Sequence, residues 1–459
     1  MLKVDPKQYA ELLSDYSELR FQENSSKQIS FVKGNLAEND QSTTSGVSAR
    51  VRKAGSWGFA SHTEITAQSV KKVVESAREN AEFLDKRLSR GRPAFEASAP
   101  QSSDDFSSEK PEMSRRQIMD FIREIDAHIA DTYPELVDRG VSLRSLDMEK
   151  SVLNSDGAYR CSMVPRTHIR VSLTLSRDGE PVQLSDNFGG LGQFEDHFSD
   201  PGNLFEGIAR IHEHLQKKAE GVHPDAGLHD CILDADLAGI LAHEAIGHTT
   251  EADMVLGGSV AGDYLGEKVA SELVTLVDFA NTCGGQRCPV PIFIDDEGSR
   301  AEDVKIIEDG VLQSFLHNKD TAQQFEHEPA GNARAYEFSD EPLIRMRNTA
   351  ILPGENRLDE MISSIDDGYY LMKPSNGQAD TTSEFMFGVV QGYEIRDGKL
   401  GRAIKDTTIS GVAFDVLQTV SMISEDMKWN SAGMCGKKQV IPVGMGGPAI
   451  KCRVNIGGR

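Results

Sequence analysis

The chain has 459 residues, with 49 basic and 72 acidic side chains and a formal net charge of −23. This charge and the lack of a basic run argue against direct binding of nucleic acid. No run of about 20 apolar residues could span a membrane. The N-terminus shows no secretory signal and the six cysteines are scattered, so we expect reduced thiols and a cytoplasmic protein.

Residues 1–95 predict an N-terminal α+β module. The stretch from Arg20 to Gly58 predicts short polar strands and turns. From Thr66 to Leu88, apolar residues recur at steps of three and four, which is typical of an amphipathic helix. Residues 96–113 are rich in serine and proline and have no periodicity, so we expect an exposed linker there.

Residues 114–225 predict a middle α+β module. Ser114 and Gln117 form a capping-box pattern at the start of a helix, since each side chain can bind the other residue's amide. Apolar and polar residues alternate over 169–175 before the turn at Asp178-Gly179. This pattern favours an antiparallel sheet with one solvent-exposed face.

Residues 226–459 predict a C-terminal domain with one prominent helix and many short strands. Strands separated by glycines favour a barrel-like or sandwich-like arrangement, and periodicity does not choose between the two. The overall class is therefore α+β. The expected strands are Ile292–Ile294, Val304–Ile307, Phe387–Ile395, Thr407–Val412 and Ile450–Ile456.

The prominent helix carries the sequence His243-Glu244-Ala245-Ile246-Gly247-His248. Two imidazoles can hold zinc while a neighbouring glutamate takes a proton from water, as in zinc hydrolases. Two histidines five residues apart lie about 140° apart on a regular α-helix, so they cannot face one ion. The helix must therefore expand by one residue, as a π-type turn, or break at Gly247. A capped helix with polar residues on an exposed face explains the same six residues without a metal.

A third ligand has to come from elsewhere in the chain. Cys435 is the best candidate, because flanking glycines allow a close approach and Lys437 and Lys438 favour the thiolate. The alternative is a small buried thiol in a turn. Glu251 and Asp253 are competing ligands, or residues that orient a histidine. We expect the glycine run at 444–447 to form a tight turn beside the cysteine.

The helix motif continues into Thr249-Thr250-Glu251-Ala252-Asp253 and is followed much later by residues 433–437 and 442–448. This ordered set resembles the TldD/PmbA family of metalloproteases, as do residues 314–316, 345–349 and 352–354. The resemblance implies that His243, His248 and Cys435 hold zinc and that Glu244 is the catalytic base. It also implies the TldD-like branch, since the PmbA (TldE) branch lacks the metal motif.

The sequence thus predicts a zinc-dependent metallopeptidase that cleaves extended or unfolded peptides. The alternative is a non-catalytic peptide-binding or regulatory subunit of a PmbA-type complex. The resemblance further implies a dimer, either of two copies or with a PmbA/TldE-type chain. Stoichiometric zinc in the purified protein would favour the enzyme over the binding subunit.

Overall fold

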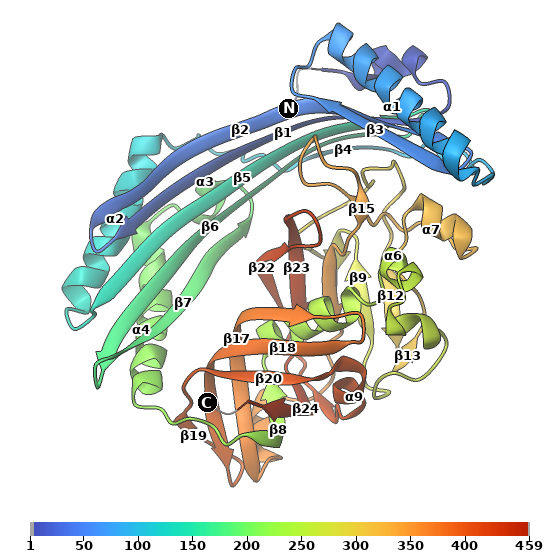
Figure 1. Cartoon of the computed structure of the whole chain (residues 1–459). Helices are drawn as coiled ribbons and strands as arrows, with labels where there is room; N and C mark the ends of the chain where they lie inside the picture. The colour runs from blue at the N-terminus through green and yellow to red at the C-terminus, as the bar shows by residue number, and fades with distance from the viewer. Residues whose placement is uncertain (1–3, 458–459) are drawn as a thin grey trace.

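The computed structural model describes residues 4–457 and has the expected α+β class (Figure 1). A long, curved sheet built by the N-terminal half arches over the C-terminal half, which holds a second sheet and a barrel. None of the helices in this described range is long and apolar enough to cross a membrane.

The N-terminal sheet has seven strands in the order β3-β2-β1-β5-β6, and both β4 and β7 pair with β6. All pairings are antiparallel except that of β4 with β6. The strands are β1 Tyr16–Val32, β2 Asn35–Lys53, β3 Ser56–His62, β4 Gln101–Asp105, β5 Asp138–Asn154, β6 Tyr159–Arg177 and β7 Glu180–Leu191.

Two predictions for this half differ from the structure. The polar stretch after Arg20 forms part of two strands of 17 and 19 residues, rather than short strands and turns. Its polar side chains are compatible with long strands because they pair across the sheet or bind the C-terminal half. The local sequence pattern does not reveal either kind of partner. The segment at 96–113 contains β4, so part of the expected linker belongs to the sheet. Strands from both sides of this segment share one sheet.

Three long helices pack against one face of the sheet, which we call the outer face (Figure 1). They are α1 Ala67–Leu88, α2 Arg115–Thr132 and α4 Phe205–Ala219. The predicted caps are present: Thr66 accepts from the amide of Ser69, and Ser114 and Gln117 form the capping box. Short helical turns occur at η1 Pro6–Leu12, α3 Phe194–His197 and η2 Pro201–Leu204.

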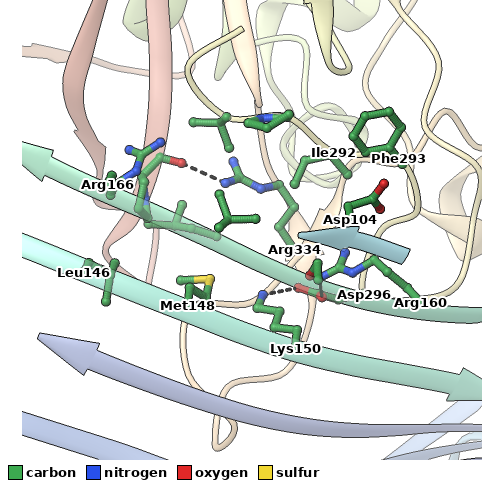
Figure 2. A pocket seen from close by; sticks show the side chains of 16 residues that line it. Asp104, Leu146, Met148, Lys150, Arg160, Arg166, Ile292, Phe293, Asp296 and Arg334 are labelled. Atoms are coloured by element: carbon green, nitrogen blue, oxygen red, sulfur yellow. Dashed lines mark hydrogen bonds and ion pairs between the residues drawn. The ribbon is translucent and has the colours of Figure 1, made fainter. Parts of the chain in front are cut away.

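The opposite, inner face of the sheet is polar, and at one end it is buried against the C-terminal half rather than exposed to solvent as expected. There the carboxylate of Asp296 accepts from Lys150 at 2.8 Å and from Arg160 at 3.2 Å (Figure 2). Arg20 lies 3.9 Å from the same carboxylate. Burial lowers the pKa of Lys150 to about 7. Burial alone would raise the pKa of Asp296, but the three cations hold it well below its ordinary value. The two halves are thus joined by shared buried charges.

The C-terminal half contains a six-stranded sheet in the order β13-β12-β9-β16-β23-β22. It also contains a closed five-stranded barrel, because β17-β8-β24-β20-β18 is completed by pairing of β17 with β18. A barrel rather than a sandwich is therefore formed. The sheet strands are β9 Leu276–Phe279, β12 Val304–Glu308, β13 Val311–Leu312, β16 Asn348–Ile351, β22 Lys428–Cys435 and β23 Ile441–Gly447; the barrel strands are β8 Gly227–Leu233, β17 Asp367–Ala379, β18 Glu384–Arg396, β20 Thr407–Val412 and β24 Ile450–Ile456.

Four of the five predicted strands are present, and the fifth, Ile292–Ile294, is wrong. This segment is a loop in which the amide of Ile292 donates to Ala280 and Ile294 makes one isolated bridge. Its apolar residues face the N-terminal sheet instead of a neighbouring strand. The remaining elements are β10 Thr282–Cys283, β11 Gln286–Arg287, β14 Ala333–Arg334, β15 Leu343–Ile344, β19 Lys399–Ala403, β21 Met422–Ile423, α6 Ala252–Leu256, η4 Val260–Asp263, α7 Lys319–Gln324, α8 Leu358–Ser363 and α9 Ala413–Gln418.

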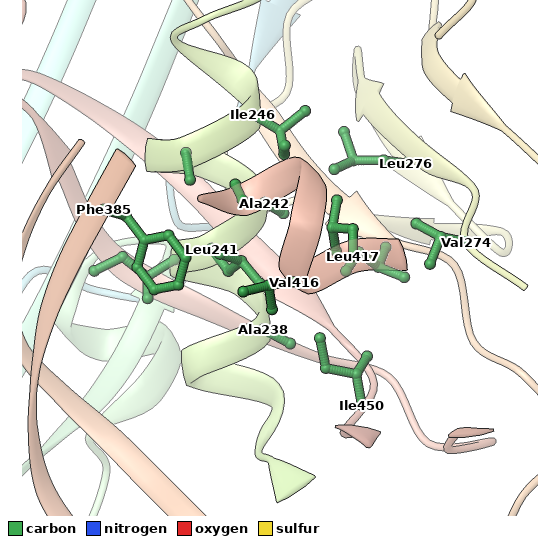
Figure 3. Packing of buried hydrophobic residues seen from close by; sticks show 14 of the residues in the cluster. Ala238, Leu241, Ala242, Ile246, Val274, Leu276, Phe385, Val416, Leu417 and Ile450 are labelled. Atoms are coloured by element: carbon green, nitrogen blue, oxygen red, sulfur yellow. The ribbon is translucent and has the colours of Figure 1, made fainter. Parts of the chain in front are cut away.

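The helix α5 Ala235–Ile240 and the turns after it lie in the main apolar core, between barrel and sheet (Figure 3). Leu241 and Ile246 pack there with Phe385 of the barrel and Leu276 of the sheet. A Cβ added to Gly239 would lie 2.9 Å from the backbone nitrogen of Gly446. The glycine run at 444–447 lies in strand β23, and the backbone of the helix packs directly against it. The predicted tight turn is wrong, because the glycines serve helix packing.

Candidate metal centre

The first histidine lies in a π-helix, η3 Leu241–Gly247, which continues α5 directly and ends just before His248. Asp234 caps α5 by accepting from the amide of Leu237 at 2.9 Å. The amide of His248 donates to the carbonyl of His243 at 3.2 Å, five residues back, which is the π pattern. The two rings consequently lie on one side, with centroids 5.3 Å apart. The expected local expansion of the helix is confirmed.

Threonine side chains add hydrogen bonds to a carbonyl of this irregular turn, that of Ile246, which also accepts from the amide of Thr250 at 3.1 Å. The hydroxyl of Thr249 donates to Ile246 at 2.8 Å, and that of Thr250 donates to the same carbonyl at 2.9 Å. Both threonines are buried, so leaving their hydroxyls without these acceptors would cost free energy. The residues after the motif thus stabilise the spacing of the two histidines.

Cys435 is the last residue of β22, an edge strand of the six-stranded sheet, and its side chain is buried. Its Sγ lies 3.1 Å from Nε2 of His248. Arg345 holds the chain beyond it by donating to the carbonyls of Cys435, Lys437 and Gln439 at 2.7, 3.0 and 2.9 Å. One donor atom from each of His243, His248 and Cys435 lies within 4.8 Å of the others. The structure thus brings together the three residues named as candidate ligands.

The electrostatics of the cluster favour a thiolate. Burial raises the pKa of the Cys435 thiol, but His243 and His248 outweigh this effect and lower it to about 3. Burial lowers the pKa of His248, but Glu251 and Cys435 outweigh it and raise the value to about 10. The thiolate is the form of cysteine that coordinates metals.

The acidic residues around the histidines have different surroundings. Glu251 is fully buried and accepts from Nδ1 of His248 at 2.9 Å, on the ring nitrogen opposite the one that faces Cys435. Asp253 instead accepts from Lys437 at 2.7 Å. Glu244 is partly exposed, with its Oε2 3.8 Å from Nε2 of His248. Glu251 is therefore placed to orient His248, whereas Glu244 faces the donor cluster.

Two residues that hold the segments around the donor cluster in place, Arg345 and Lys437, were not predicted as site residues from the sequence. Arg345 appeared only within the resembling segment 345–349, and Lys437 only as a charge near the cysteine. The structure shows Lys437 bound to both Asp253 and Glu251, the latter at 3.1 Å. These contacts join segments far apart in the chain, so no local pattern reveals them.

The residues present fit a zinc ion. Both ring nitrogens of His243 are buried and without a hydrogen-bond partner among the described residues, which is costly for an imidazole. Two imidazole nitrogens and one thiolate form a donor set that zinc prefers. A partly exposed carboxylate stands beside this set. Fold and site together define a candidate metal centre made of two histidines and one cysteine.

Family comparisons agree with such a centre. The PmbA/TldA metallopeptidase C-terminal domain matches residues 226–458, and domain 1 of the same family matches residues 17–81. A protein named "Metalloprotease" from Methanothermobacter thermautotrophicus is 32% identical over 96% of this chain and 94% of its own length. The chain belongs to the PmbA/TldD family of metallopeptidases.

A further relative, named "Zinc metalloprotease TldD homolog", comes from Saccharolobus solfataricus and is 32% identical over 62% of this chain and 64% of its own length. Two solved structures share the fold at lower identity. A putative modulator of DNA gyrase from Thermotoga maritima is 19% identical with a TM-score of 0.78, covering 96% of both chains. TldE from Thermococcus kodakarensis is 18% identical with a TM-score of 0.72, covering 98% of both chains.

Proposed function

We propose that this protein is a zinc-dependent metallopeptidase of the TldD-like branch that cleaves extended or unfolded peptides. The observation that carries the proposal is the convergence of His243, His248 and Cys435 within 4.8 Å, beside the carboxylate of Glu244. The name of the Saccharolobus solfataricus relative supports zinc as the metal.

In this proposal His243, His248 and Cys435 hold the ion, and Glu251 fixes the ring of His248 through Nδ1. Bound zinc supplies a Lewis acid that polarises the scissile carbonyl and makes water more acidic. Glu244 takes the proton of the attacking water and then delivers it to the leaving amine. Its partial exposure suits this role, because the base must reach both water and substrate.

We also propose the wider assignment of the chain. Residues 226–459 form the metallopeptidase domain, preceded by modules at 1–95 and 114–225 and a connecting segment at 96–113; the family match over 226–458 supports the first of these. The protein works as a homodimer or as a heterodimer with a PmbA/TldE-type chain, which the shared fold with TldE supports. Six free cysteines support a cytoplasmic location.

The variant Glu244→Ala tests the proposal. We expect it to keep stoichiometric zinc, measured by elemental analysis, and to lose cleavage of an unstructured peptide library. The control Glu206→Ala removes an exposed carboxylate on α4 and should keep both properties. Undiminished cleavage by Glu244→Ala would show that this residue is not the base. Wild-type protein with neither zinc nor chelator-sensitive cleavage would favour the non-catalytic subunit.

A further inference from the structure

A cavity of about 460 Å³ lies between the inner face of the N-terminal sheet and strand β22. The sheet side includes Arg144 of β5 and Arg166, His168 and Arg170 of β6. The opposite side includes Met434, which directly precedes Cys435. The cavity therefore begins one residue from a proposed zinc ligand.

Strand register explains why the basic side chains gather there. Arg144 pairs with His168, and the next pairs on the same face join Leu146 with Arg166 and Ser142 with Arg170. Alternate residues of a strand point to the same face, so all three arginines project into the cavity. We call Arg144, Arg166 and Arg170 the arginine cluster.

The positive charge of this cluster has no counter-charge on the walls of the cavity itself. Among the described residues no carboxylate lines it, in a protein whose net charge is −23. Within residues 4–457, the side chain of Arg144 has neither a hydrogen bond nor an ion pair, and that of Arg170 bonds only to the hydroxyl of Ser185, at 2.7 Å. Burial and Arg166 lower the pKa of His168 to about 4, so that ring is neutral near pH 7 and adds no further positive charge.

Arg166 is the most informative member of the cluster. It is 7% exposed, yet among the described residues its guanidinium has one hydrogen bond, to the carbonyl of Pro289 at 2.8 Å, and no carboxylate partner. Other buried arginines without a carboxylate partner, Arg334 and Arg345, donate to two and three carbonyls. Figure 2 shows Arg166 at the far end of the buried interface from Asp296. Its spare N–H groups suit an anion that enters the cavity.

We propose that the arginine cluster binds carboxylates of the peptide substrate, which makes this protein selective for acidic peptides. The inference rests on the proposed peptidase function and names its substrate class. Arginine binds carboxylates through paired hydrogen bonds, and partial burial strengthens them. From Ser431 to Cys435 the strand β22 runs about 13 Å at 3.3 Å per residue. A carboxylate a few residues from the scissile bond can therefore reach the cluster.

Peptide pairs that differ in one charge test the inference. One pair carries Glu or Gln near the cleavage point, and another has a free or amidated C-terminus, which separates side-chain carboxylates from the terminal one. We expect kcat/KM to favour at least one charged member by roughly tenfold, the effect of one charge-assisted contact. Fluorescence anisotropy with Glu244→Ala protein measures the same preference as binding, without cleavage.

The variant Arg144→Gln/Arg170→Gln changes the exposed members of the cluster, and Arg166→Lys changes the buried one. Each should reduce the ratio between charged and neutral peptides several-fold. The control Arg116→Gln removes one positive charge from the outer side of α2 and should keep the ratio. In wild-type protein the ratio should also fall as sodium chloride is raised, since salt screens the exposed arginines.

Equal cleavage of charged and neutral peptides would overturn the inference and leave the peptidase function standing. A charge preference in binding without any cleavage would support the binding of carboxylates by the arginine cluster and contradict the peptidase function. A double variant that keeps the ratio but loses its dimer would assign the cluster to a subunit contact, which also overturns the inference.

Discussion

Glu251 lies fully buried between His248 and Lys437, where its Oε2 contacts both side chains. A partner that fixes the ring of a ligand histidine typically changes metal affinity 10- to 100-fold when it is mutated. We therefore expect Glu251→Gln to weaken zinc binding by about that factor, measured by competition with a chromophoric chelator. The control Asp253→Asn alters a carboxylate that binds Lys437 rather than His248, and its effect should be smaller. Equal losses would argue against an orienting role.

His317 gives a second residue-scale prediction, on pH. It is 3% exposed, and burial together with His327 lowers its pKa from 6.5 to about 4. The unfolded chain therefore binds this proton more readily, so the free energy of unfolding falls as pH decreases from 6.5 to 4. The loss from this one group should approach about 3 kcal/mol. In urea titrations across this range, His317→Gln should show a shallower pH dependence. An unchanged slope would contradict the assignment.

At this scale the sequence identified much of the candidate site. The histidines, Glu244 and Cys435 could be named because their residue types and spacing carry chemical meaning. The arrangement around them could not. Glu251 was left open between ligand and orienting residue, and only its position on the Nδ1 side of His248 separates these roles. That position depends on tertiary packing.

At the scale of single elements, the close contact between α5 and β23 positions the π-helix. A methyl group on Gly239 would meet the backbone of Gly446, which cannot move aside as a flexible side chain could. We expect Gly239→Ala to lower the free energy of unfolding by about 1–3 kcal/mol and to weaken zinc binding, because the helix must shift away from the sheet. Calorimetry and chelator competition measure these effects.

The control for that variant is Gly140→Ala in β5, where the nearest atom to an added Cβ is 3.9 Å away. It should leave zinc affinity unchanged. If Gly239→Ala binds zinc as tightly as wild type, the contact between helix and strand does not position the histidines.

Elements with local signals were predicted best. The helices α1 and α2 have apolar periodicity and caps within their own sequence. The length of β1 and β2 was missed, because their polar residues are held by partners hundreds of positions away, as when Arg20 donates to the carbonyl of Glu337. Strand β23 was mistaken for a turn because glycine runs are typical of turns, and its packing partner lies in another element.

For the whole molecule, the buried charges around Asp296 join the N-terminal sheet to the C-terminal half. One carboxylate interacts with Lys150, Arg160 and Arg20, so Asp296→Asn removes the counter-charge that three buried cations share. We expect this variant to lose about 3–5 kcal/mol in urea unfolding.

Lys150→Met provides the matched control, because the carboxylate keeps two cations and a buried charge is removed. Its effect should be near neutral. If both variants are equally mild, the shared carboxylate does not hold the two halves together.

The order of segments along the chain has a consequence for biosynthesis. Strand β24, the last barrel strand along the chain, and Cys435, which completes the donor cluster, both follow the histidine motif by well over a hundred residues. During translation, His243 and His248 therefore leave the ribosome long before Cys435 is synthesised. If the proposed function holds, a chain cut between His248 and Cys435 lacks the third zinc ligand and should be inert.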